Sequence, residues 1–115
     1  MDNYIEHRPW GSFEHLLDCE YCKVKRITVY PGQRLSYQYH FKRSEVWTIV
    51  QGSALITLDG VITRYKAGET ITIPIKTKHR IQNDTEEPVI FIEVQHGEYF
   101  GEDDIVRLSD DYKRV

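Results

Sequence analysis

The side chains of greatest chemical interest in this sequence are one amide, two imidazoles and one carboxylate. Gln38 and His40 are separated by one residue, and Glu45 follows after four more. His79 comes from a later segment. Because side chains at i and i+2 of a strand share a face, Gln38 and His40 point the same way. Each is an ordinary polar residue when taken singly, but together these donors suit a borderline divalent cation, so we predict one bound metal ion, with zinc expected ahead of manganese, cobalt, nickel or iron.

Short strands must position these ligands, because β-rich runs separated by turn residues fill most of the chain. Asp59-Gly60 between two such runs is a hairpin signal, and Pro31-Gly32 marks another turn. Short strands with this spacing are typical of an all-β sandwich or barrel. The predicted strands cover residues 13–17, 21–30, 35–40, 45–50, 54–58, 61–65, 69–74, 80–83 and 89–95.

The two ends of the chain lack a strand pattern. Pro9 disfavours a helical conformation for Arg8, so residues 1–12 are expected to form an irregular arm. The polar stretch 101–115 is expected to be a tail with at most one helical turn.

Cys19 and Cys22 form a Cys-x-x-Cys motif. A structural zinc site would need a second pair of ligands, and a redox motif would need a βαβ context. Neither accompanies the motif, so we expect a turn that carries two thiols.

Length and charge limit the classes of function. A chain of 115 residues and 13.6 kDa has the size of one domain. Its 15 Lys and Arg against 18 Asp and Glu give a net charge of −3, spread along the chain, so neither nucleic acid nor an acidic membrane is an expected partner. No apolar run approaches the roughly 20 residues of a membrane span, and the N-terminus lacks the layout of a signal peptide. We therefore expect a soluble, cytoplasmic protein.

The spacing of the predicted ligands and their flanking glycines resembles the two sequence motifs of the cupin family. The first motif spans residues 32–52, with Gln38 in the place of its first histidine. The second spans residues 68–83, with Lys76 where the motif has a glycine. The resemblance implies a single cupin domain over residues 1–115, folded as a double-stranded β-helix or jelly-roll barrel.

Further segments are similar to the type II mannose-6-phosphate isomerase domain, which commonly forms the C-terminal part of bifunctional mannose-1-phosphate guanylyltransferase/isomerase enzymes. A stand-alone domain without the guanylyltransferase part is expected here. The similarity implies a metal-dependent isomerase that interconverts mannose 6-phosphate and fructose 6-phosphate, with a sugar phosphate as partner and a homodimer as assembly. The segments are Arg8-Pro-Trp-Gly, Val24-Lys-Arg-Ile, Pro31-Gly, Ile92-Glu-Val-Gln, Gly101-Glu-Asp-Asp-Ile-Val-Arg107 and Asp111-Tyr112-x-Arg114.

The isomerase resemblance adds candidate residues for catalysis and substrate binding. Lys25 and Glu93 are candidates for the base that moves a proton between C1 and C2 of the opened sugar. Arg107 is expected to stabilise enediolate charge or to bind the phosphate. Further phosphate-binding candidates are Arg8, Arg80 and Lys42.

The sequence departs from the isomerase pattern close to the predicted ligands. Where that family has three histidines followed by arginine, this chain has His40-Phe41-Lys42-Arg43. The ligand position survives, whereas two polar neighbours change. Other departures are Val46, Lys76, Lys78 and Lys113.

Two alternatives to an isomerase therefore stay open. One is a non-catalytic or weakly catalytic cupin that binds a sugar phosphate or sugar nucleotide, as a sensor or as a subunit partner of a separate mannose-1-phosphate guanylyltransferase. The other is a structural dimer module with an incidental metal.

Overall fold

The computed structural model describes residues 4–112, so the predictions that involve Lys113 and Arg114 lie outside the described residues. Within this part of the chain there are eleven strands and no helix, and hence no helix that could cross a membrane. The strands are β1 (Tyr4–Arg8), β2 (Gly11–Asp18), β3 (Cys22–Val29), β4 (Tyr37–Tyr39), β5 (Arg43–Gln51), β6 (Ser53–Leu58), β7 (Val61–Lys66), β8 (Thr70–Ile73), β9 (His79–Gln82), β10 (Val89–Gly97) and β11 (Val106–Ser109).

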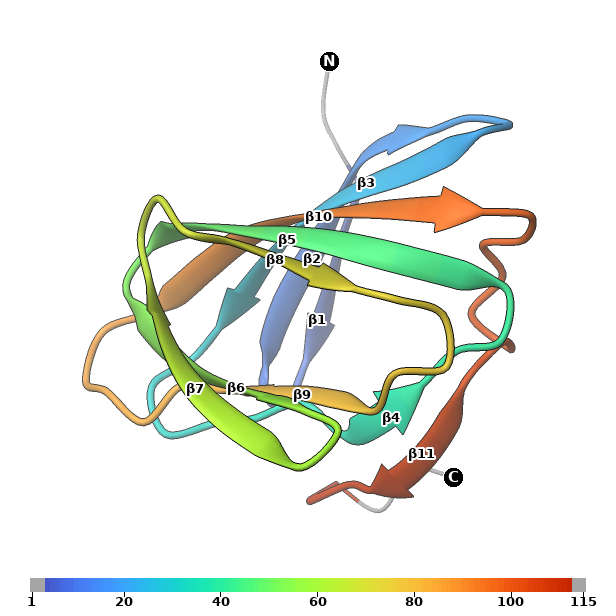
Figure 1. Ribbon diagram of the computed structural model, residues 1–115. Coiled ribbons are helices and arrows are strands. Elements are labelled where there is room, and N and C mark those ends of the chain that lie inside the picture. Colours follow the sequence, from blue (N-terminus) through green and yellow to red (C-terminus); the bar gives the residue numbers. More distant parts are fainter. Residues whose placement is uncertain (1–3, 113–115) are drawn as a thin grey trace.

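The strands form two antiparallel sheets that face each other (Figure 1). The larger sheet has the order β1-β2-β3-β10-β5-β8, and the smaller has the order β11-β4-β9-β6-β7. The chain passes repeatedly from one sheet to the other, as from β5 to β6 and from β9 to β10. This winding is a double-stranded β-helix, which confirms the predicted all-β cupin barrel.

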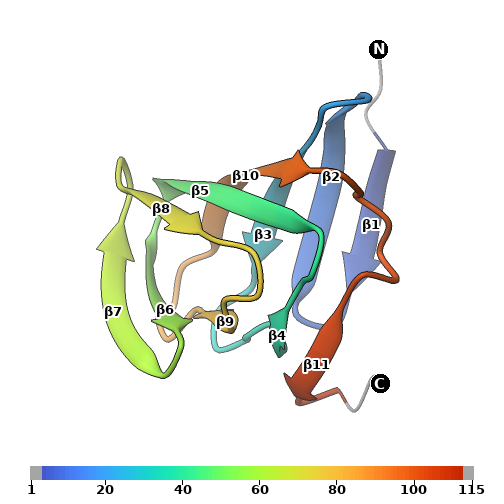
Figure 2. The same cartoon turned by 45° about the vertical axis from the view of Figure 1, so that its right-hand side comes forward.

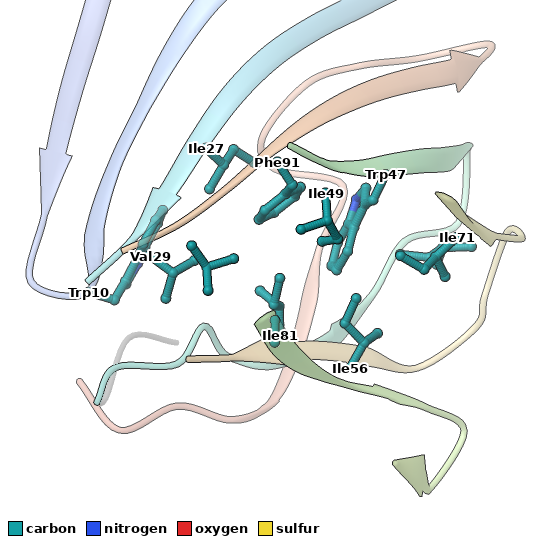
Figure 3. Close-up of a cluster of buried hydrophobic side chains, with 12 residues drawn as sticks. Trp10, Ile27, Val29, Trp47, Ile49, Ile56, Ile71, Ile81 and Phe91 are labelled. Carbon is teal, nitrogen blue, oxygen red and sulfur yellow. The ribbon is translucent and has the colours of Figure 1, made fainter. Parts of the chain in front are cut away.

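The core lies between the sheets and consists of side chains that alternate along the strands (Figure 3). On β5, Trp47 and Ile49 point inward and are buried, whereas Thr48 between them is not. Within this cluster the rings of Trp47 and Phe91 pack against each other, with their centroids 4.7 Å apart. The buried apolar residues are Trp10, Ile27, Val29, Trp47, Ile49, Ala54, Ile56, Ile71, Ile73, Ile81, Val89 and Phe91.

The prediction of an irregular N-terminal arm is wrong, because β1 and β2 form a hairpin at the edge of the larger sheet (Figure 2). Arg8 pairs with Gly11, and Pro9 and Trp10 make the turn between them. Trp10 is 4% exposed, so burial of this large ring fixes the hairpin against the core. The residues of β1 are mostly exposed, and an edge strand without a buried face leaves no apolar alternation in the sequence.

The prediction of a C-terminal tail without a strand is also wrong. Residues 106–109 form β11, which pairs with β4 at the edge of the smaller sheet. Arg107 lies opposite Gln38 in this pairing. The tail therefore extends the sheet that carries two of the predicted metal ligands.

Candidate metal centre

Inward-facing side chains change from apolar to polar partway along several strands. On β10, Val89 and Phe91 are apolar, and the next two inward positions, Glu93 and Gln95, are polar yet buried. Strand pairing brings such positions together, since Glu93 lies opposite Lys25 on β3. We call the group Lys25, Arg43, Glu45, His79, Glu93 and Gln95 the polar end of the barrel, and the group Val29, Ile49, Ala54, Ile56, Ile81, Val89 and Phe91 the apolar end.

Three predicted ligands meet at the polar end. His40, Glu45 and His79 each offer one ligand atom, and these atoms all lie within 4.8 Å of one another. The three residues are 2–3% exposed, so water competes little for them. Two imidazoles and one carboxylate at this separation fit a divalent ion such as zinc, iron or manganese.

Backbone carbonyls orient both imidazoles. His40 Nδ1 lies 2.7 Å from the carbonyl oxygen of Asp104, and His79 Nδ1 lies 2.9 Å from that of Thr77. Because a carbonyl only accepts, Nδ1 carries the proton in each ring, and the Nε2 lone pair points toward Glu45. Metal-binding histidines are commonly held by such bonds.

Burial keeps the imidazole of His40 neutral. Desolvation lowers the pKa of His40 to about 4, and the positive charge of Arg43 acts in the same direction, while the carboxylate of Glu45 opposes both. A neutral imidazole is the form that binds a metal ion.

Glu45 is held as a carboxylate by its neighbours. Burial raises its pKa, but the positive charge of Arg43, with smaller contributions from the two nearby imidazoles, outweighs burial and brings the pKa to about 2. Arg43 Nε donates to one oxygen at 2.9 Å, and Trp47 Nε1 donates to the other at 2.9 Å. Both donors leave lone pairs on the carboxylate for a metal ion.

Gln38 lies beside the histidine ligands. It is directly opposite His79 in the pairing of β4 with β9, and it lines the same cavity as His40 and Glu45. Its amide oxygen is suited to be a fourth ligand.

The cavity around these residues has a volume of about 190 Å³ and is lined by most of the side chains predicted for catalysis or substrate binding. Lys25, Glu93, Arg107 and Arg8 all contribute to its lining. Burial, and secondarily the negative charge of Glu45, raise the pKa of Glu93 to about 8. The cavity therefore contains a carboxyl group that exchanges a proton near neutral pH.

Two predicted phosphate-binding residues lie elsewhere. Lys42 is exposed, with its Nζ 5.2 Å from the ring centroid of Tyr99. Arg80 donates to the carbonyl oxygens of Leu35 and Ser109, outside the cavity lining. Arg80 is on β9 next to the inward-facing His79, so alternation points it to the other side of the sheet.

Arg43 is a cavity residue that sequence reasoning did not single out. Besides its bond to Glu45, its Nη2 lies 3.3 Å from His40 Nε2, and its buried Nη1 has no hydrogen-bond partner among residues 4–112. The spacing of Arg43 and Glu45, two residues apart on β5, is the signal that places both on one face.

The segment between β10 and β11 closes the site and was also missed as a functional element. The carboxylate of Asp104 accepts the backbone N–H groups of Phe41 and Lys42, and its own carbonyl orients His40. Glu102 lies 2.6 Å from Lys25 Nζ. These contacts join residues more than 60 positions apart, and no local pattern in the sequence indicates them.

The family model for the mannose-6-phosphate isomerase C-terminal domain matches residues 2–110. The chain belongs to this family. It is 44% identical over 121 residues to a mannose-1-phosphate guanylyltransferase of Salmonella montevideo, and 44% identical over 114 residues to the alginate biosynthesis protein AlgA of Pseudomonas aeruginosa. These matches cover 99% and 98% of the chain, but only 26% and 24% of the relatives, so this family domain spans about a quarter of their length.

Solved cupin-like structures share the fold at low identity. Oxalate decarboxylase from Bacillus subtilis superposes with a TM-score of 0.82 and 22% identity, covering 93% of this chain and 30% of that one. The capsular polysaccharide assembling protein CapF from Staphylococcus aureus gives 0.81 and 21%, covering 95% and 32%. A double-stranded β-helix protein from Klebsiella pneumoniae gives 0.78 and 22%, covering 89% and 87%.

Proposed function

We propose that this chain is a metal-dependent isomerase that interconverts mannose 6-phosphate and fructose 6-phosphate. The observation that carries the proposal is a single cavity lined both by His40, Glu45 and His79 and by a carboxyl group of raised pKa, Glu93. Membership of the isomerase C-terminal family supports this choice of reaction.

We assign the metal to His40, Glu45 and His79, with Gln38 as a fourth ligand. A divalent ion bound there would supply Lewis-acid polarisation of the sugar carbonyl and of the neighbouring hydroxyl. The bonds of the two Nδ1 atoms to backbone carbonyls keep both Nε2 atoms available. Trp47 fixes the direction of the Glu45 carboxylate, so the ligands are held in place before binding.

Glu93 is our choice for the group that moves the proton between C1 and C2. A pKa of about 8 lets its carboxyl group both donate and accept a proton near neutral pH, which is the condition for acid–base catalysis in both directions. Lys25 lies opposite Glu93 in the sheet, and its Nζ is held by Glu102 at 2.6 Å. In this arrangement Lys25 orients the substrate hydroxyls and is the second candidate base.

We assign Arg107 and Arg8 to binding the negatively charged groups of the substrate. Both line the cavity, whereas Lys42 and Arg80 do not. A guanidinium group can bind a phosphate or an enediolate oxygen through two parallel hydrogen bonds. The changed positions Phe41 and Lys42 are exposed and absent from the lining, which supports retention of the family reaction.

A second function is favoured by one contact. Arg43 donates to Glu45 and approaches His40 Nε2, so its guanidinium group occupies two of the atoms that would hold a metal. A cupin that binds a sugar phosphate through Arg43 without metal or turnover is the corresponding alternative. Such a protein would suit a sensor, or a subunit of a guanylyltransferase, the activity named for several relatives.

The test begins with protein stripped of metal by a chelator and reloaded separately with zinc, manganese, cobalt or nickel. Each form is mixed with mannose 6-phosphate, and fructose 6-phosphate is measured. We expect turnover with at least one metal and none after stripping. Turnover by none of the forms, together with a rise in melting temperature on adding the sugar phosphate, would replace the isomerase with the binding protein.

Two variants separate metal binding from catalysis. Arg107→Ala should keep full metal content and lose most activity, because its side chain lines the cavity but is not a ligand. Glu93→Gln should also keep the metal and reduce the maximal rate by about 10²–10⁴-fold, the usual contribution of an acid–base group. Undiminished rates in Glu93→Gln would transfer the proton-moving role to Lys25. A homodimer and a cytoplasmic location stay predictions, and sedimentation analysis tests the first.

A further inference from the structure

The two cysteines face each other at the tip of the hairpin formed by β2 and β3. The last pair in this strand ladder is Asp18 with Lys23, so Cys19 and Cys22 are the next opposed residues, separated by a two-residue connection. The backbone N–H of Cys19 donates to the carbonyl of Cys22 at 3.0 Å. The two Sγ atoms are 3.3 Å apart.

This geometry meets the requirements of a disulfide bond. Directly opposed residues that share a backbone hydrogen bond in an antiparallel pair have Cα atoms about 5.5 Å apart. Disulfides form over Cα separations of about 4.4–6.8 Å with an S–S length of about 2.05 Å. Bond formation thus needs the sulfurs to approach by about 1 Å, which side-chain rotation supplies without a shift of the hairpin backbone.

The surroundings favour thiol chemistry over metal binding. Both cysteines are free and partly exposed, and the tip residue Tyr21 is among the most exposed aromatic residues of the described chain. Among residues 4–112, the one group of three or more His, Cys, Asp and Glu side chains close enough to hold a metal is His40, Glu45 and His79. A tetrahedral metal site at the hairpin tip therefore lacks ligands from the described chain.

We propose that Cys19 and Cys22 form a reversible disulfide bond with each other. The oxidant is a small-molecule disulfide such as oxidised glutathione. This inference does not rest on the isomerase proposal. It goes beyond the sequence expectation of a turn that carries two thiols, because the sequence could not show that the two sulfurs are in contact.

The reaction proceeds in two exchange steps. The Cys19 thiolate attacks one sulfur of the oxidant, forms a mixed disulfide and releases one thiolate. Cys22 then loses its proton to solvent, attacks Cys19 Sγ and releases the second thiolate. The protein loses two electrons and two protons, and the oxidant becomes two thiols.

Cys19 is assigned as the attacking thiol. The hydrogen bond from the Cys22 thiol lowers the pKa of Cys19, and the same contact raises the pKa of Cys22. Thiolate is the reactive form, so Cys19 reacts first and Cys22 resolves the mixed disulfide.

The loop closed by the disulfide contains few residues, so the bond adds little to the stability of the fold through chain entropy. We therefore interpret it as a reversible modification and not as a structural cross-link.

The test uses the full chain, in which these are the only two cysteines, and measures intact mass after incubation with oxidised glutathione. We expect a monomer that is lighter than the reduced protein by two hydrogen atoms and has no thiol that can be alkylated. Dithiothreitol should restore both the original mass and the two thiols. Cys19→Ser and Cys22→Ser should each retain one glutathione instead. Wild-type protein that keeps glutathione on both cysteines, or that forms linked dimers, would overturn the proposal.

Two further measurements test whether the folded hairpin, and not the Cys-x-x-Cys sequence alone, promotes the disulfide and sets which cysteine reacts first. The equilibrium constant for disulfide formation should be at least about tenfold higher in native protein than in urea, because the hairpin raises the effective concentration of one thiol beside the other. An equal or lower native value would refute a role for this geometry. Cys22→Ser should take up glutathione several-fold faster than Cys19→Ser, and the reverse order would overturn the assignment of the attacking thiol.

Discussion

The apolar and polar ends of this barrel are built from the same strands, with the same alternation of inward and outward side chains. They differ in role, because one stabilises the fold and the other contains the groups suited to chemistry. On β10, Phe91 at the apolar end is fully buried with hydrocarbon neighbours, and Glu93, the next inward residue, is buried beside other charged groups. The first kind of burial stabilises the fold through removal of apolar surface from water. The second kind is unfavourable for an isolated charge, so it marks a position retained for chemistry.

The largest effect is expected at the apolar end. Phe91→Ala removes a ring that packs on Trp47 and should lower the free energy of unfolding of metal-free protein by about 3–5 kcal/mol. Urea unfolding measures this change. If Phe91→Ala does not fold, the smaller change Phe91→Leu allows the stability cost at the apolar end to be measured instead. A decrease in the free energy of unfolding of less than about 1 kcal/mol in both variants would contradict the idea that the apolar end is the part that stabilises the fold.

At the polar end, His79→Ala should lower metal affinity by more than about 100-fold, because loss of an outer-shell partner alone typically costs 10- to 100-fold. Its cost to the unfolding free energy of metal-free protein should be smaller than that of Phe91→Ala. Competition with a chromophoric chelator measures the affinity. His96→Ala is the matched control, since His96 is exposed on β10 and should leave the affinity unchanged. Full metal content in His79→Ala would invalidate the assigned site.

Glu93 gives the polar end a characteristic pH dependence. Its pKa is raised from 4.5 to about 8, so folded protein holds a proton that the unfolded chain has released. Stability from this group is complete below about pH 4.5 and is lost as pH rises to about 8, at up to about 1.4 kcal/mol per pH unit. Unfolding of metal-free protein across this range, compared with Glu93→Gln, isolates the loss. Parallel curves for the two proteins would contradict the raised pKa.

The smallest effect concerns the turn before His79. Lys76 has a φ of 66°, a left-handed conformation that glycine adopts without strain, and the cupin motif has glycine at this position. Lys76→Gly should therefore raise the unfolding free energy by up to about 1 kcal/mol without changing metal affinity. Lys78→Gly, at a residue without positive φ, should lower it. Equal effects of the two changes would show that Lys76 is unstrained.

Spacing predicted most of the strands and the convergence of three proposed ligands, because both follow from a two-residue period and from turn residues. His40, Glu45 and His79 converge as expected, and Gln38, Lys25, Glu93, Arg107 and Arg8 line the same cavity. The roles of these residues stay predictions. What spacing could not indicate is long-range closure, such as the contact of Asp104 with His40.

The missed features share a physical cause. β1 and β11 are edge strands, in which only one side pairs and few side chains are buried, so neither leaves an apolar alternation. Arg43 looks like a surface residue in the sequence and becomes buried through its bond to Glu45. Lys42, next to it, has the same charge and remains exposed, because it lies in the bend that precedes β5.

The central position of β10 has a consequence for how this molecule folds. β10 lies between β3 and β5, although it comes last of the three in the chain. A growing polypeptide that has not yet reached residue 97 cannot join the two halves of the larger sheet, so the barrel closes only after β10 has been synthesised. Pairing between such distant segments is slow, and barrels of this kind fold in milliseconds to seconds. Pairing of β10 therefore completes the core between the sheets, and the segment that follows it then closes the polar end through Glu102 and Asp104.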